Sequence, residues 1–174
     1  LDRAAQNLPP LNSNISKQQL LKRIVDCGIV GLGGGGFPSQ EKILAAPDDP
    51  SLLIINAVEC EPYLSCDDRL AQEKAQDLIR FALLLAKILR IPKTIIALSE
   101  DRTLAIQALE EARKVMEGPR PEFLITRPFY PSGSERQLVA QATGIDLRQD
   151  QTPAEKGLLV FNLATLWAVS YTHL

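Results

Sequence analysis

The chain has 174 residues, which is enough for one domain with a sizeable buried core. Its net charge of −2 argues against nucleic acid as the main partner, because phosphate binding favours a basic surface. Its hydrophobic share of 45% is that of an ordinary globular protein, and its longest apolar stretch, residues 81–86, is too short to span a bilayer, so we expect no transmembrane segment.

Hydrophobic periodicity switches repeatedly between helical and strand spacing along the chain. Residues 1–15, which are polar and contain two adjacent prolines, are expected to form an extended lead-in to one domain over residues 16–169. The pattern predicts helices at residues 17–27, 39–44, 67–89, 101–117 and 134–142, and strands at residues 51–56, 94–98 and 122–127. The segment from residue 157 onward begins with a strand-like pattern and ends with a helical one. This alternation predicts an α/β fold with a mostly parallel sheet flanked by helices.

A glycine-rich stretch at residues 28–42, GIVGLGGGGFPSQEK, holds six glycines in nine positions. Glycine has no Cβ, so a flat ligand can approach its main chain, and free N–H groups in such loops can bind anions. Gly31, Gly33 and Gly36 satisfy G-x-G-x-x-G, but the preceding residues have helical rather than strand spacing. The pattern alone leaves a nucleotide or flavin loop and a flexible turn equally open.

Two carboxylates, Glu59 and Glu61, follow the predicted strand at residues 51–56. Ligands of open α/β sheets bind beyond the carboxyl ends of the strands, where carboxylates can accept hydrogen bonds from ribose hydroxyls or a carboxamide. Taken alone, a solvated acidic loop is the favoured alternative. Asp67 and Asp68 are expected to interact with the positive N-terminus of the next helix.

A turn at residues 130–133 leads into the helix predicted from residue 134, and Tyr130 and Glu135 flank this junction. An aromatic ring and a carboxylate beside free N–H groups suit a nucleotide base and sugar, and a capped helix with Tyr130 in the core is an equal alternative. Phe37 could stack on a planar ring or simply pack, and Lys42 could neutralise a phosphate or be solvated.

The three cysteines form no C-x-x-C pair, which favours a reducing compartment over a disulfide framework. We expect Cys60 and Cys66 to be small buried hydrophobic residues rather than redox partners. The single histidine disfavours hydrolytic nucleophilic catalysis.

Four motifs occur in one order: GIVGLGGGGFPSQEK, IINAVECEPYLSCDDRL, YPSGSERQL and FNLATLWAV. Together they resemble the C subunit of the Rnf ion-translocating electron-transport complex over about residues 20–169. More distantly, they resemble the NADH-binding flavoprotein subunit of respiratory complex I. The resemblance implies a Rossmann-like layered domain in which NADH passes hydride to FMN, and this chemistry needs no side-chain acid or base.

The resemblance also assigns residues to the two cofactors, with no metal ligand and no catalytic side chain. Those that would line FMN are Gly31, Gly33, Gly34, Gly36, Lys42, Asn56, Glu59, Asn162 and Thr165. Those that would contact NADH are Phe37, Glu61, Tyr130 and Glu135.

Departures from these families refine the expectation. Leu32 and Val58 stand where complex I has arginine and aspartate, whereas the Rnf side tolerates apolar residues there. The cysteine motifs for two [4Fe–4S] clusters of Rnf members are absent, so electrons would leave through clusters outside this chain. The resemblance implies other subunits of a membrane complex as partners and a peripheral place on the cytoplasmic face of the inner (cell) membrane. Residues 170–174 do not look like the family's continuing helix and could be a truncation scar or a foreign tail.

Two alternatives remain at this point. One is the flavoprotein of another NADH-linked dehydrogenase or a hydrogenase. The other is a binding or assembly module that keeps the fold without cofactor.

Overall fold

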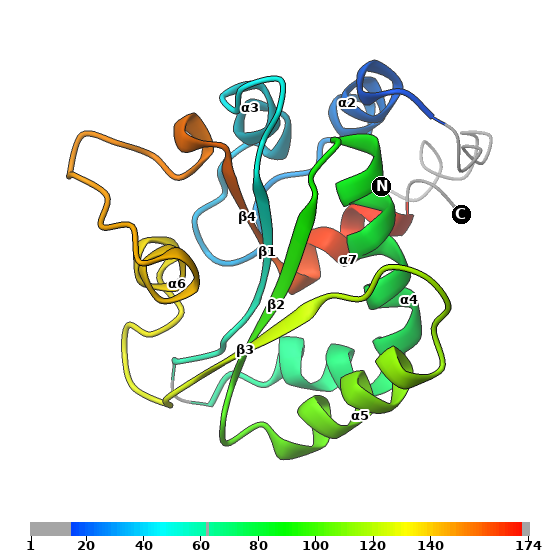
Figure 1. The fold of residues 1–174 in the computed structure, drawn as a ribbon, viewed down its shortest axis with the longest axis vertical. Coiled ribbons are helices and arrows are strands. Elements are labelled where there is room, and N and C mark those ends of the chain that lie inside the picture. Colours follow the sequence, from blue (N-terminus) through cyan, green and yellow to red (C-terminus); the bar gives the residue numbers. More distant parts are fainter. Residues whose placement is uncertain (1–14, 62, 172–174) are drawn as a thin grey trace.

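The computed structural model describes residues 15–61 and 63–171, and the predicted lead-in lies outside this part of the chain except for its last residue. A sheet of four parallel strands in the order β3-β2-β1-β4 forms its centre (Figure 1). The strands are β1 Leu52–Ala57, β2 Lys93–Ser99, β3 Glu122–Thr126 and β4 Leu158–Asn162. The predicted parallel α/β sheet is confirmed.

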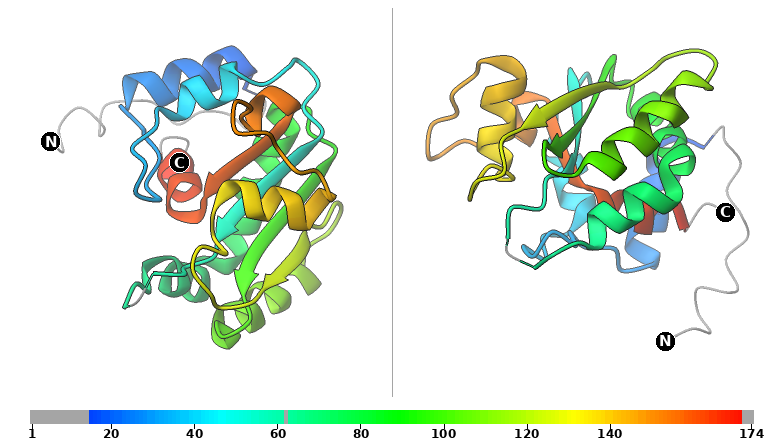
Figure 2. Two further views of the ribbon diagram at one scale, coloured as in Figure 1. Left: turned by 90° about the vertical axis from the view of Figure 1, so that its left-hand side faces the viewer. Right: turned by 90° about the horizontal axis from the view of Figure 1, so that it is seen from below.

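Helices cover both faces of the sheet. α4 (Cys66–Ile88), α5 (Thr103–Lys114) and α7 (Leu163–Tyr171) lie on one side, and α6 (Glu135–Thr143) lies on the other (Figures 1 and 2). The remaining helices are α2 (Lys17–Asp26), α3 (Ser39–Leu44) and the short 3-10 helix η1 (Ala154–Lys156). The fold is therefore a three-layered α/β arrangement.

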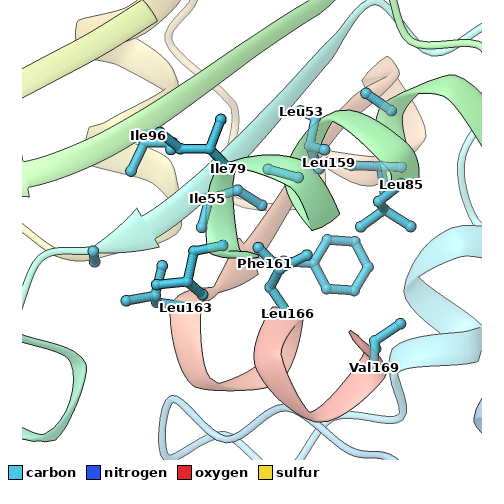
Figure 3. Close-up of a cluster of buried hydrophobic side chains, with 14 of the residues drawn as sticks. Leu53, Ile55, Ile79, Leu85, Ile96, Leu159, Phe161, Leu163, Leu166 and Val169 are labelled. Carbon is cyan, nitrogen blue, oxygen red and sulfur yellow. The ribbon is translucent and has the colours of Figure 1, made fainter. Parts of the chain in front are cut away.

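Strand β1 divides the core into two because its successive side chains point to opposite faces. Leu53 and Ile55 pack with α4 and α7, in the cluster that Figure 3 shows around Phe161 and Leu166. Leu52 and Ile54 belong to the second cluster, under α6. Burial on both faces explains why β1 is an uninterrupted apolar run rather than an alternating one.

The register of the parallel strands determines where polar side chains meet. Asn56 on β1 is the register partner of Asn162 on β4 and of Ala97 on β2. The carboxyl ends of β1 and β4 are thus level with each other. The segments that follow them leave the sheet at the same edge.

Most predicted helices agree closely with the structure. Ser16 and Gln19 form a reciprocal capping box at the start of α2, with bonds of 2.8 and 3.2 Å. α5 is shorter than predicted at both ends: a turn closed by the Arg102 N–H on the carbonyl of Ser99 delays its start to Thr103, and it ends at Lys114 rather than at residue 117.

The last helix, α7, continues two residues beyond residue 169. Ser170 is buried and its hydroxyl donates to the carbonyl of Trp167 at 2.6 Å. Residues 172–174 lie outside the described part of the chain. Within residues 15–61 and 63–171, no helix combines the length and apolar character needed to cross a membrane.

Candidate functional site

A cleft of about 620 Å³ opens at the edge of the sheet where β1 and β4 end. Its volume is in the range of small-molecule and cofactor sites, about 300–1,000 Å³. Every residue that the sequence analysis assigned to FMN or NADH lines this cleft. Their contacts with either ligand stay predictions. The lining residues that were not assigned are Leu32, Gly35, Ser39, Val58, Cys60, Leu64, Cys66, Asp67, Pro131, Gly133, Ser134 and Phe161.

The glycine-rich loop presents bare backbone to its surroundings. The Gly31 N–H donates to the carbonyl of Phe37 at 2.8 Å, and the Gly36 N–H donates to the carbonyl of Gly31 at 3.2 Å, so the loop closes on itself. Gly34 and Gly36 have φ of +92° and +59°, which favours glycine. A Cβ placed on Gly34, Gly35 or Gly36 would meet no atom within 4 Å.

One hydrogen bond connects this loop to α7, and a second connects α7 to the end of β4. The Leu32 N–H donates to Thr165 Oγ1 at 2.9 Å, and the Thr165 N–H donates to Asn162 Oδ1 at 3.2 Å. Gly33 packs so closely that an added Cβ would lie 3.2 Å from the Cβ of Asn162. The close packing and the hydrogen bonds hold the loop over the end of β4.

The buried carboxylate of Glu59 caps α4. It accepts the N–H groups of Asp67 and Asp68 at 2.9 and 3.0 Å and the Cys66 thiol at 3.2 Å. A carboxylate is stabilised at this end of a helix by free N–H groups and the helix dipole. The solvated-loop alternative therefore fails for Glu59, whereas Glu61 is exposed.

The expectation of two buried cysteines was wrong for Cys66. Its side chain is exposed because it occupies the first position of α4, at the mouth of the cleft, and Cys60 is only half-buried. The hydrogen bond to the Glu59 carboxylate raises the pKa of the Cys66 thiol, and burial and the charges of Asp67 and Glu59 add to the rise. The thiol is thus a poorer nucleophile than an ordinary cysteine.

Asp67 faces the interior rather than solvent. It is 5% exposed, and its Oδ2 accepts the Asn162 Nδ2 amide at 2.5 Å. Burial raises the pKa of Asp67 from 3.8 to about 6; the charge of Glu59 adds to this rise, while the bond from Asn162 and the N–H of Ala164 oppose it.

Asn56 uses both ends of its amide. Its Nδ2 donates to the carbonyl of Gly133 at 2.8 Å, and its Oδ1 accepts the Val58 N–H at 3.0 Å. A Cβ on Gly133 would lie 2.7 Å from the carbonyl oxygen of Val58, so only glycine fits this approach. The turn that carries Tyr130 is thereby held against the end of β1.

Lys42 reaches from α3 to two other elements. Its ammonium is paired with the carboxylate of Glu135 on α6 and donates to the carbonyl of Val160 on β4 at 2.8 Å. The side chain of Lys42 is 19% exposed, so it is not the freely solvated lysine of the simpler interpretation.

Two groups of lining side chains differ in their exposure. We call Asn56, Glu59, Asp67, Asn162 and Thr165 the floor, because all are buried or half-buried and hydrogen-bonded within the protein. We call Phe37, Glu61 and Tyr130 the rim, because all are exposed. Tyr130 is 74% exposed, which excludes the alternative that it packs in the core.

The family of the chain follows from a match over most of its length. The pattern described as the Nuo51 FMN-binding domain matches residues 24–171. The chain belongs to this family. It is 38% identical over 158 residues to the C subunit of the ion-translocating oxidoreductase complex of Haemophilus influenzae (strain ATCC 51907 / DSM 11121 / KW20 / Rd), and 41% identical over 152 residues to the protein of the same name in Pseudomonas aeruginosa.

These relatives are much longer proteins. The match covers 90% of the present chain but 19% of the Haemophilus protein, and 86% of the chain but 19% of the Pseudomonas protein. For the corresponding protein of Rhodobacter capsulatus the identity is 35%, over 97% of the chain and 33% of the relative. The chain therefore spans between a fifth and a third of the length of these members of its family.

Solved structures support the fold of the family. An NAD+-reducing [NiFe]-hydrogenase in the H2-reduced state matches with a TM-score of 0.79 at 24% identity, over 99% of this chain and 35% of that chain. The air-oxidised state of such a hydrogenase matches with a TM-score of 0.72 at 25% identity, over 97% and 30%. The layered α/β fold is thus shared with a part of an NAD+-reducing hydrogenase.

Proposed function

We propose that the cleft binds FMN against the glycine-rich loop and NADH at the rim, as the electron-input domain of an ion-translocating electron-transport complex. When both are bound, the flavin supplies the redox chemistry by accepting hydride from the nicotinamide. The chain binds, orients and shields these groups, which is the usual contribution of a protein to cofactor chemistry.

The bare backbone of Gly34, Gly35 and Gly36 carries this proposal. A Cβ would protrude into open space there, so the three residues offer main chain rather than side chains to a flat ring system. The hydroxyl of Ser39 adds support, since Ser39 is 2% exposed, lines the cleft, and its Oγ has no hydrogen-bond partner within the described residues. A polar ligand would satisfy it.

The rim supports a second, nucleotide ligand. The exposed rings of Phe37 and Tyr130 can stack on planar groups, and the Glu61 carboxylate can accept hydrogen bonds from sugar hydroxyls or an amide. The ammonium of Lys42 lines the cleft and is neutralised by Glu135 in this structure, so a phosphate would bind it by displacing that carboxylate.

The names of the relatives support the wider setting. They are subunits of ion-translocating oxidoreductase complexes. We infer that the protein to which this chain belongs passes electrons to [4Fe–4S] clusters outside residues 1–174, joins other subunits, and lies peripherally on the cytoplasmic face of the inner membrane.

An absorbance titration tests the proposal. Purified protein is mixed with FMN and then treated anaerobically with NADH. We expect a perturbed flavin band near ~450 nm that bleaches with NADH, because binding and orientation are all that the protein must supply. An unperturbed band in this chain and in the longer protein would contradict the proposal and favour a module without cofactor.

Variants of Gly35 connect the result to the loop. Gly35→Leu should abolish flavin binding by filling the open space, whereas Gly35→Ala adds only a Cβ and should bind nearly as well as the wild type. Thermal unfolding checks that both variants fold. Equal flavin binding by the leucine variant would place the ligand elsewhere.

A further inference from the structure

We propose that Asp67 is a positioning residue of the cleft, which acts through Asn162 and Thr165 to hold the glycine-rich loop in its binding conformation. The role deepens the proposed binding of FMN and rests on it for its functional consequence. Asp67 was expected only to interact with the N-terminus of α4, and neither the family nor the names of the relatives assign it a task.

Three consecutive hydrogen bonds run from Asp67 to the loop. Asp67 Oδ2 accepts from Asn162 Nδ2 at 2.5 Å, Asn162 Oδ1 accepts from the Thr165 N–H at 3.2 Å, and Thr165 Oγ1 accepts from the Leu32 N–H at 2.9 Å. The chain of bonds joins α4, the end of β4, α7 and the loop. Asp67 and Thr165 are 5% and 2% exposed, so water does not replace these bonds easily.

Asp67 acts on the loop by fixing the orientation of the Asn162 amide. An asparagine amide has one accepting and one donating end, and only one of its two orientations serves both neighbours here. A carboxylate at Asp67 requires the NH2 end, which leaves Oδ1 for the Thr165 N–H. Without an acceptor at position 67, the amide can flip and the cap of α7 is lost.

The backbone of Asp67 is itself held in place. Its N–H donates to Glu59 Oε1, so the carboxylate that caps α4 also fixes the position of Asp67 at the start of that helix. The groups that face it are Glu59 from the segment after β1, Cys66 on α4 itself, and the neutral Asn162 and the Ala164 N–H at the start of α7. None of these supplies a full positive charge.

This environment makes the hold on the loop sensitive to pH. Burial is the main cause that raises the pKa of Asp67 to about 6, and the charge of Glu59 adds to the rise. The charge-assisted bond to Asn162 is present above that pH and weakens below it, when the carboxyl becomes neutral. The loop should therefore be held more tightly at pH 7.5 than at pH 5.

Amide hydrogen exchange at Leu32 in the protein without added FMN tests the role directly. We expect exchange at Leu32 to be about tenfold faster in Asp67→Ala than in the wild type, and to be slowed again in Asp67→Asn, whose amide oxygen can still accept from Asn162. The wild type should exchange faster at pH 5 than at pH 7.5, after correction for intrinsic rates, and Asp67→Asn should lose this difference.

Asp68→Asn is the matched control, because Asp68 Oδ2 accepts from Gln72 Nε2, whereas the side-chain hydrogen bonds of Asn162 go to Asp67 and Thr165. It should keep both the wild-type exchange and its pH dependence. Equal Leu32 exchange in Asp67→Ala and wild type would overturn the proposal. If Asp67→Ala does not fold, an unchanged pH dependence in Asp67→Asn overturns it instead.

The flavin titration on the same variants separates this proposal from the proposed function. We expect Asp67→Ala to bind FMN about tenfold more weakly than the wild type, with rescue in Asp67→Asn at pH 7.5. If the wild type binds no FMN while the exchange pattern is as expected, the proposed function fails and the hold on the loop stands. If FMN binds equally to all variants although the exchange differs, the loop conformation does not govern binding and the proposal is overturned.

Discussion

The floor and the rim of the cleft differ in how their side chains are satisfied. Floor residues such as Asn56 and Glu59 form hydrogen bonds with backbone groups of the protein, whereas rim residues such as Tyr130 and Glu61 face solvent. The floor therefore gives the cleft its shape before any ligand arrives, and the side chains of the rim stay free to contact one. A preorganised floor lowers the entropy cost of binding.

The largest effect expected to test this difference between floor and rim is on the free energy of unfolding, and it comes from Asp67 in the floor. Its pKa is about 6 in the folded protein against 3.8 ordinarily, so between these values the folded state binds more protons than the unfolded state. The contribution of Asp67 thus favours folding below about pH 4 and is lost as the pH rises through 6, by up to about 3 kcal/mol.

Urea unfolding of wild type and Asp67→Asn at pH 4 and pH 7.5 measures this contribution. We expect the wild type to lose more free energy of unfolding than the variant between the two pH values. Identical losses would show that Asp67 titrates normally and does not belong to the buried floor.

The next effect concerns the contact between the Tyr130 turn and β1. Gly133→Ala should lower the free energy of unfolding by about 2 kcal/mol, because the new Cβ would lie 2.7 Å from the Val58 carbonyl oxygen. Gly35→Ala is the control, since its Cβ meets nothing within 4 Å. Chemical denaturation checks both, and a stable Gly133→Ala would mean that the turn moves freely relative to the floor.

A smaller effect is expected at the rim. Tyr130→Ala should change the free energy of unfolding by less than about 0.5 kcal/mol, because its ring is 74% exposed. It should weaken NADH binding about tenfold through the lost stacking, with FMN affinity nearly constant. Calorimetry measures both affinities, and the exposed neighbour Phe129, which does not line the cleft, provides the control variant Phe129→Ala. If Tyr130→Ala weakened NADH and FMN binding equally, the rim would not act separately from the floor.

The smallest effect is expected for Glu61→Gln. Removing the negative charge weakens an acceptor of ribose or amide hydrogen bonds without removing it, so NADH affinity should fall a few-fold and FMN affinity less. Glu100→Gln, at an exposed carboxylate outside the cleft, should leave both affinities at the wild-type values. Equal NADH affinity of Glu61→Gln and wild type in calorimetry would refute the role of Glu61.

Elements with a local signal could be predicted from the sequence, and contacts between distant segments could not. α3 has its predicted bounds, and β1 is shifted by one residue, because glycine, proline and apolar runs mark their ends. The rim could be predicted by residue type together with the family resemblance. Asp67 lies in the first turn of α4 as predicted, but Glu59 supplies the side-chain cap of that helix and Asp67 bonds to Asn162, 95 residues further along the chain. Periodicity carries no signal for such a contact.

The pairing of β1 with β4 determines when the cleft can form. Leu52 pairs with Leu158, and both Asn162 and Thr165 follow that residue in the chain. On the ribosome, β1, β2 and β3 can associate with α4 and α5 first, while the hydrogen bond from the Leu32 N–H to Thr165 forms only after α7 emerges. Contacts of such sequence separation form late. The cleft is therefore expected to be the last part of this fold to be completed during synthesis.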